Sequence, residues 1–157
     1  MEEIYSKRLF GKLQVARVQE QLTDLTAADL VASHSPIVSG DLTLRELADE
    51  QIVRETKWQR FLVTDNEGQL LGAISLDNFR TIPQQLWAET QIKEVMRPIA
   101  ESTIVQADRP LLEVMQLIEK HKLSALTVIR DNGVLVGILE KTAILSLLQK
   151  RMLSNPA

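Results

Sequence analysis

The side chains best suited to catalysis or metal binding are few in this sequence and do not cluster. Cysteine is absent, which excludes disulfides, thiolate zinc sites and a cysteine nucleophile. The two histidines, His34 and His121, have no carboxylate at ligand spacing, so no metal site is expected. The chain also lacks a Gly-rich phosphate loop and a Gly-x-Ser-x-Gly elbow. We therefore predict no catalytic residues, and a protein that binds rather than an enzyme.

Charge and hydropathy exclude two further classes. The 157 residues carry 18 basic and 21 acidic side chains, a net charge of −3. Because nucleic-acid binding usually needs a basic surface, no nucleic-acid partner is expected. No run approaches the roughly 18 apolar residues that a membrane-spanning helix needs, and basic residues interrupt any signal-peptide core near the N-terminus. We expect a soluble chain without a membrane span.

An internal repeat organises the chain. Ile37–Glu46 matches Ile104–Glu113 at five of ten positions, with residue numbers that differ by 67. Gly68–Gly72 matches Gly133–Gly137 with a difference of 65, so the first copy carries two extra residues near Arg54–Lys57. Two matches in the same order indicate that the two halves are copies of one unit.

Each copy is predicted to form a β-α-β-β-α unit. The expected strands are Ile37-Val38, Arg60–Thr64 and Gln69–Ile74 in the first copy, and Ile104-Val105, Ala125–Ile129 and Val134–Leu139 in the second. Helical spacing of apolar residues follows the first strand of each copy, from Leu44 and from Leu111. Asp41 and Asp108 stand where a helix start favours a carboxylate. The last helices are expected to begin near Asp77 and Thr142.

The predicted fold class is therefore α/β (α+β), with two pseudo-symmetric repeats stacked as one module on a shared core. A unit of this size buries too little surface to be stable alone. We expect a linker helix over 1–22, a first repeat with its connector over 23–90 and a second repeat over 91–157. Pro83 should end the preceding helix. Trp87 should pack the connector onto the body, with ligand stacking as the alternative.

These residues resemble a tandem pair of CBS domains, named after cystathionine β-synthase. In the first copy the resemblance rests on Ile37-Val38 with Asp41 and Leu44, on Phe61–Asp65, and on Gly68-x-Leu70-Leu71-Gly72-x-Ile74-Ser75-x-x-Asn78. In the second it rests on Ile104-Val105 with Asp108 and Leu111, on Leu126–Val128, and on Gly133-x-Leu135-Val136-Gly137-Ile138. It covers about residues 25–150, and no single piece is specific by itself.

The resemblance implies a ligand cleft between the copies, which most often holds an adenine nucleotide. It carries over to the first strand, the start of the hairpin and the turn into the last helix: Ile37, Val38, Arg60, Phe61, Leu62, Ser75, Asp77 and Asn78. A hydroxyl at a helix start suits a phosphate, and Asn78 replaces the aspartate that would accept ribose hydroxyls. The alternative makes Ser75 a helix N-cap with Asn78 in its first turn. AMP, ADP, ATP or S-adenosylmethionine are the expected ligands, and no cofactor is required.

The second copy departs further from the family pattern. Glu140 occupies the hydroxyl position and Ala143 the aspartate position. A carboxylate there would repel a phosphate, and an alanine cannot hold a ribose. We therefore expect any ligand to favour the half-site of Ser75 and Asn78. His121, beside Lys120 and Lys122, is expected to be a charge at the end of a helix.

A narrower resemblance concerns the membrane zinc proteases that are similar to site-2 protease. Thr81–Trp87 followed by Ile92–Met96 looks like their C-terminal CBS pair, and Leu13–Val18 like the segment that leaves their last membrane helix. Their His-Glu-x-x-His motif is absent here. The basic segment Met1–Leu22 could face an anionic cytoplasmic leaflet or pack as an ordinary helix.

The function that follows is a regulatory module, expected to be a homodimer, that binds an adenine nucleotide and controls an attached or associated protein such as a membrane metalloprotease. It would act in the cytoplasm or at the inner face of the membrane. A ligand-free module for dimerisation or tethering is the alternative, and an independent enzyme is poorly supported.

Overall fold

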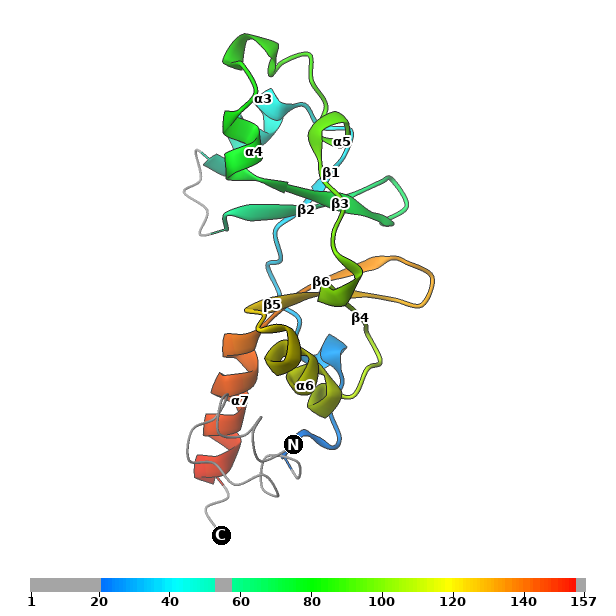
Figure 1. Cartoon of the computed structure of the whole chain (residues 1–157), viewed down its shortest axis with the longest axis vertical. Coiled ribbons are helices and arrows are strands. Elements are labelled where there is room, and N and C mark those ends of the chain that lie inside the picture. Colours follow the sequence, from blue (N-terminus) through cyan, green and yellow to red (C-terminus); the bar gives the residue numbers. More distant parts are fainter. Residues whose placement is uncertain (1–20, 53–57, 155–157) are drawn as a thin grey trace. The chain divides into compact units, whose positions relative to one another are not determined.

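A computed structural model describes residues 21–52 and 58–154, and the chain divides into two compact units (Figure 1). Unit 2 consists of residues 34–100 with 132–135, and unit 1 of residues up to 33, 101–131 and those from 136 onward. The predictions for Met1–Leu22 and Arg54–Lys57 fall almost entirely outside the described residues. No helix in the described part of the chain is long and apolar enough to span a membrane.

The sheet of unit 2 has three strands in the order β1-β2-β3: β1 (Ile37–Ser39), β2 (Arg60–Thr64) and β3 (Leu70–Ser75). β1 runs parallel to β2, and β2 pairs antiparallel with β3 through a hairpin. The Asp65 carboxylate holds the turn by accepting the backbone N–H groups of Glu67 and Gln69, each over 2.9 Å. Gly68 has φ +83°, which favours glycine. The hairpin predicted from turn residues is confirmed.

The helices of unit 2 are short. They are α3 (Leu44–Leu47), which continues into the π-helical turn η2 (Ala48–Ile52), then α4 (Leu76–Arg80), η3 (Gln84–Leu86) and α5 (Ile92–Val95). Thr43 is the N-cap of α3, and its hydroxyl accepts the N–H of Glu46 over 3.1 Å. The prediction that Asp41 caps this helix is therefore wrong. α4 ends at Arg80, ahead of Pro83, as predicted.

Buried side chains in unit 2 come from all of its strands and from α3, α4 and α5. Phe61, Val63 and Phe79 are each at most 1% exposed. Trp87 packs on Phe79 with ring centroids 4.3 Å apart, and its indole N–H donates to the carbonyl of Ile82 over 2.9 Å. The prediction that Trp87 packs the connector onto the body is confirmed.

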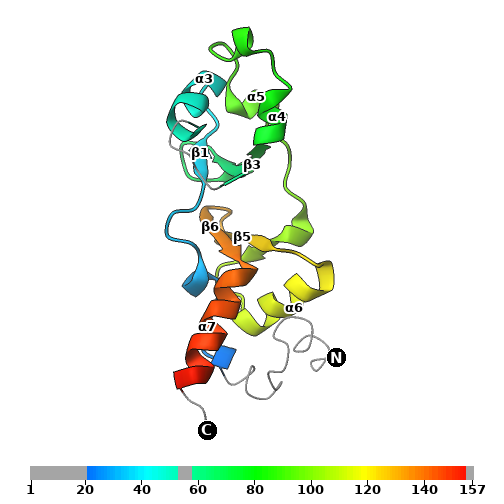
Figure 2. The same cartoon turned by 90° about the vertical axis from the view of Figure 1, so that its left-hand side faces the viewer.

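Unit 1 repeats the plan with longer helices. It contains η1 (Ala27–Leu30), η4 (Glu101–Thr103), β4 (Ile104–Gln106), α6 (Leu111–His121), β5 (Ala125–Ile129), β6 (Leu135–Glu140) and α7 (Lys141–Ser154). The strand order is β4-β5-β6, and α6 and α7 lie on one side of this sheet in both views (Figure 2). Pro110 precedes α6, so Asp108 does not cap it, contrary to prediction. His121 ends α6 as predicted.

The segment that leads into each repeat packs in the unit of the other repeat. Leu22 and Ala27 are fully buried in unit 1 with Val105 and Leu111, and the N–H of Ala27 donates to the carbonyl of Arg109 over 2.9 Å. In unit 2 the N–H of Ile92 donates in the same way to Leu42 over 2.8 Å. The buried residues form two clusters, one in each unit.

Candidate ligand half-site

The predicted site residues of the first repeat all belong to unit 2, at the edge where β1 and β2 begin and β3 ends. Arg60 lies opposite Ser75 in the antiparallel register, and Ile37 pairs with Leu62 on the other side of β2. The side chains of Arg60 and Ile37 are exposed. Val38, Phe61 and Leu62 are at most 6% exposed as whole residues, so they leave a ligand little surface to contact.

Ser75 is the N-cap of α4, and this position explains its backbone conformation. Its φ and ψ are −102° and 160°, and its hydroxyl accepts the N–H of Asn78 over 3.1 Å. A serine at this position stabilises the helix start by satisfying a backbone donor. Ser75 therefore has the structural role of an N-cap, and a role in ligand binding would be additional to it.

Asp77 and Asn78 point to different surroundings. The Asp77 side chain is 96% exposed and faces Arg80, with 3.8 Å between Oδ1 and Nη1. Asn78 is half-buried and turns back to Ser75. Of the two polar residues in the first turn of α4, Asn78 therefore belongs to the half-site by its contacts.

The Asn78 amide also contacts a residue that sequence reasoning missed. With the amide oriented so that both its atoms meet suitable partners, Nδ2 donates to Ser75 Oγ over 2.9 Å. Oδ1 then accepts from Arg97 Nε at 2.8 Å and from Nη2 at 3.1 Å. The position where the family pattern has a carboxylate therefore holds a neutral amide bound by a guanidinium.

The backbone fixes Arg97 at this place. Arg97 and Ala73 exchange two hydrogen bonds, each of 2.8 Å, in an isolated antiparallel bridge at the outer side of β3. Gly72 allows this approach, because a Cβ atom on it would lie 2.6 Å from the Arg97 carbonyl oxygen. The position of Arg97 is therefore set by β3, the same strand that ends at Ser75.

The corresponding turn of unit 1 has the same backbone and different side chains. The N–H of Lys141 donates to Ser124 over 2.8 Å, as that of Leu76 donates to Gln59 over 3.0 Å in unit 2. Glu140 ends β6 at the position of Ser75, and Ala143 lies in the first turn of α7. Positions 140 and 143 therefore offer an anion neither the hydroxyl nor the amide that Ser75 and Asn78 supply in unit 2.

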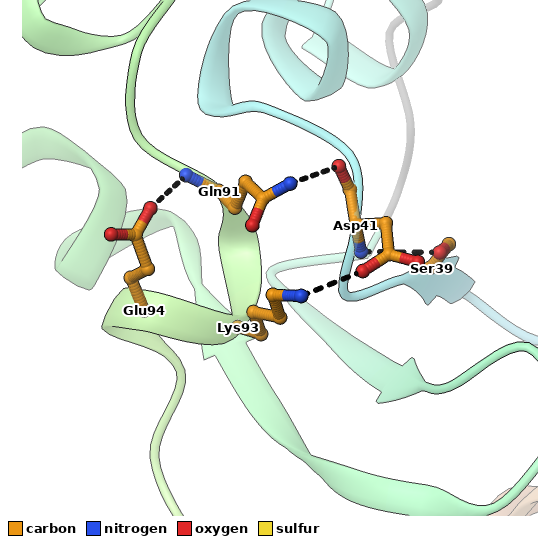
Figure 3. A network of polar contacts seen from close by, with 5 residues as sticks. All are labelled: Ser39, Asp41, Gln91, Lys93 and Glu94. Carbon is orange, nitrogen blue, oxygen red and sulfur yellow. Dashed lines mark hydrogen bonds and ion pairs between the residues drawn. The ribbon is translucent and has the colours of Figure 1, made fainter.

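A polar network lies at the other end of the unit 2 sheet, after β1 (Figure 3). Lys93 Nζ lies 2.9 Å from Asp41 Oδ1, and the Gln91 side chain donates to the Asp41 carbonyl over 3.3 Å. In unit 1 the matching backbone bond to Ala107 comes from Ala28, which has no charge to offer Asp108. A surface cavity of about 230 Å³ lies beside Asp108 in unit 1, lined by Gln106, Ala107, Asp108, Arg130 and Asp131.

In unit 2, the contacts of Asp41 with Lys93 and Gln91 account for Asp41 as a structural residue.

Metal chemistry finds no support in the part of the chain that the structure describes. No group of three or more histidine, cysteine, aspartate or glutamate residues is placed to hold an ion there. What the half-site offers is hydrogen bonding and positive charge, which suit recognition of a ligand.

Comparison with protein families gives a direct match. The model described as "CBS domain" matches residues 27–83 and 92–150. A Synechocystis protein that carries the name of a zinc metalloprotease is 37% identical over 134 residues, which are 85% of this chain and 35% of that protein. The chain spans little more than a third of the length of the two curated relatives that it matches.

Solved structures share the fold at low sequence identity. The CBS domain of a bacterial CNNM/CorC-family Mg²⁺ transporter, solved with ATP, has a TM-score of 0.62 and 12% identity over 85% of this chain and 94% of that one. The CBS domain pair of protein MJ0100, solved with 5′-methylthioadenosine and S-adenosyl-L-methionine, has a TM-score of 0.55 and 19% identity over 81% and 98%. The predicted pair of β-α-β-β-α repeats is confirmed at the level of the fold.

Proposed function

Because this chain belongs to the CBS-domain family, we propose that it is a regulatory module that binds an adenine nucleotide or a related ligand and controls an attached or associated protein. The observation that carries the proposal is the turn from β3 into α4, where Ser75 and Asn78 stand in the positions of the family's hydroxyl and carboxylate. The ligands named for the CBS structures above, ATP and S-adenosyl-L-methionine, support the ligand class.

Control would follow from differential binding. A ligand that touches Ser75 and Asn78 can shift a conformational equilibrium only by its difference in affinity for the two states. We place the ligand-competent surface in the first repeat, over 23–90, with Arg97 added from the start of the segment 91–157 that forms the second repeat. Glu140 and Ala143 of the second repeat do not suit a nucleotide.

A thermal-shift panel with AMP, ADP, ATP and S-adenosylmethionine tests ligand binding. Ligand that binds only the folded state raises the melting temperature, by an amount that grows with its concentration over Kd. We expect one ligand to stabilise the chain selectively and the effect to disappear in Ser75→Ala/Asn78→Ala. The matched control is Thr43→Ala, which removes the N-cap of α3 away from the half-site. No shift with any ligand at millimolar concentration contradicts the proposal.

We propose a membrane metalloprotease as the controlled protein, with the module at the cytoplasmic face of the membrane. The support is the 37% identity to the Synechocystis protein over 85% of this chain. The test exchanges the CBS pair of that protein for this chain and follows cleavage of a membrane-bound substrate with and without nucleotide. A cleavage rate that nucleotide does not change, with the exchanged pair folded, argues against control of this kind.

The second candidate is a ligand-free module for dimerisation or tethering. It is favoured by the Asn78 side chain, whose hydrogen bonds are satisfied by Ser75 and Arg97 without a ligand. Light scattering separates the candidates: a stable homodimer whose mass and melting temperature no nucleotide alters supports the structural role. We expect the homodimer in both cases, and ligand-dependent stability only in the first.

A further inference from the structure

We propose that Arg97 and Arg60 make the Ser75–Asn78 half-site selective for ligands that carry phosphate, so that AMP, ADP or ATP binds in preference to adenosine or S-adenosylmethionine. The inference rests on the proposed function and names its ligand class. The starting observation is the positive charge at the half-site. A site that binds only the ribose hydroxyls would use a carboxylate at position 78, whereas here Asn78 is bound by Arg97.

Two arginines belong to the half-site, Arg97 by direct contact and Arg60 by its place in the strand register. Arg97 contacts Asn78 directly, and Arg60 lies opposite Ser75 across β2 and β3, where paired residues share one face of the sheet. Within the described part of the chain, neither arginine forms an ion pair. The nearby carboxylate of Asp77 faces Arg80 instead.

Arg97 keeps free donors after it has bound Asn78. A guanidinium carries five N–H donors in a planar fork, and Asn78 Oδ1 accepts two of them. The remaining three have no hydrogen-bond partner in the described part of the chain. Phosphate suits them because its oxygens accept paired N–H bonds from a guanidinium, whereas a ribose diol offers no charge.

The arginine is fixed rather than free to move away. Its backbone bridge to Ala73 and the close approach to Gly72 hold its Cα beside β3. A ligand therefore meets a positive group that is already positioned, which lowers the cost of ordering it on binding. S-adenosylmethionine brings a sulfonium cation to the same place and is disfavoured by repulsion.

Isothermal titration of the intact chain at low salt tests the selectivity, with AMP, adenosine, S-adenosylmethionine and pyrophosphate as probes. We expect AMP to bind at least about tenfold more tightly than adenosine, as one charge-assisted contact would give. Arg97→Gln and Arg60→Gln should each reduce this ratio, and both together should bring it close to one. Arg80→Gln is the matched control, since Arg80 lies on α4 and faces Asp77.

The outcomes separate the inference from the proposed function. Equal affinity for AMP and adenosine in the natural chain overturns the inference and leaves nucleotide binding standing, as does a ratio that survives in the double variant. Pyrophosphate binding that needs Arg97, without binding of any adenine compound, keeps the anion selectivity and removes the adenine ligand. Failure of all four probes in the titration, and of ADP and ATP in the thermal-shift panel, overturns both. Circular dichroism of each variant checks that it is folded, and Arg97→Lys, which keeps the charge, should retain part of the preference.

Discussion

The carbonyl oxygen of Arg97 lies 2.6 Å from the point where a Cβ atom on residue 72 would stand. Gly72→Ala is therefore expected to push the segment around Arg97 away from Ala73 and to lower the free energy of unfolding by about 2 kcal/mol, as overpacking does. Urea unfolding measures the loss. Gly40→Ala is the control, because its Cβ would meet only side-chain atoms at 3.2–3.4 Å. A smaller loss for Gly72→Ala than for Gly40→Ala would contradict the close approach.

Ser75 has a capping role and a proposed ligand role, and two substitutions separate them. Ser75→Ala removes the N-cap of α4 and should lower the free energy of unfolding by about 1 kcal/mol. Ser75→Asp keeps a capping oxygen and should cost little stability, but its carboxylate should weaken AMP binding by about tenfold. Urea unfolding and titration are read side by side. Unchanged AMP affinity in Ser75→Asp would place the ligand elsewhere.

Asn78→Asp restores the carboxylate of the family pattern and should give it an ion pair with Arg97. Since that pair is partly exposed, the gain in unfolding free energy should stay below about 1 kcal/mol. The larger effect is on binding, where neutralisation of Arg97 should lower the preference for AMP over adenosine. Titration with both ligands measures the ratio. An increased preference for AMP would show that Arg97 does not supply the charge.

Trp87 contributes a ring contact and a hydrogen bond that can be removed in turn. Trp87→Phe loses the bond to the Ile82 carbonyl and should cost about 1 kcal/mol. Trp87→Ala also loses the packing on Phe79 and should cost about 3 kcal/mol. Thermal and urea unfolding follow both. Equal costs for the two variants would mean that the ring itself does not anchor the connector.

Lys93 and Asp41 form a surface ion pair with side chains that are 47% and 51% exposed. Such pairs contribute little, so Lys93→Met should lower the free energy of unfolding by less than about 1 kcal/mol, and high salt should reduce the difference. Asp108→Asn is the control. In unit 1 the position that corresponds to Lys93 is held by Ala28, so this substitution removes no lysine contact. A coupling energy of several kcal/mol in an Asp41→Asn/Lys93→Met double-mutant cycle would refute this estimate.

Local signals in the sequence were enough for most of the fold. The strands Arg60–Thr64 and Ala125–Ile129 were predicted with the bounds that the structure has, because their apolar runs end at clear turns. The N-cap of α3 was misassigned to Asp41, although Thr43 followed by Glu46 three residues later is the capping-box pattern. The capping-box pattern is present in the sequence, but the matching positions of Asp41 and Asp108 in the two repeats favoured the aspartate instead.

The candidate site was only partly accessible from the sequence. Ser75 and Asn78 are three residues apart in one turn, so their contact follows from local spacing. Arg97 reaches Asn78 through an isolated bridge to Ala73, and no periodic pattern marks such a contact. The exchange of leading segments between the units escaped prediction for the same reason, since Ala27 meets Arg109 far along the chain.

Leu22 and Ala27 are buried in the core of unit 1, and the N–H of Ala27 donates to the carbonyl of Arg109. The segment that leads into the first repeat is therefore stabilised by the second. A cut of the chain between the two repeats would separate this segment from the side chains that bury it, so the boundary of a fragment that folds by itself does not coincide with the boundary of a repeat.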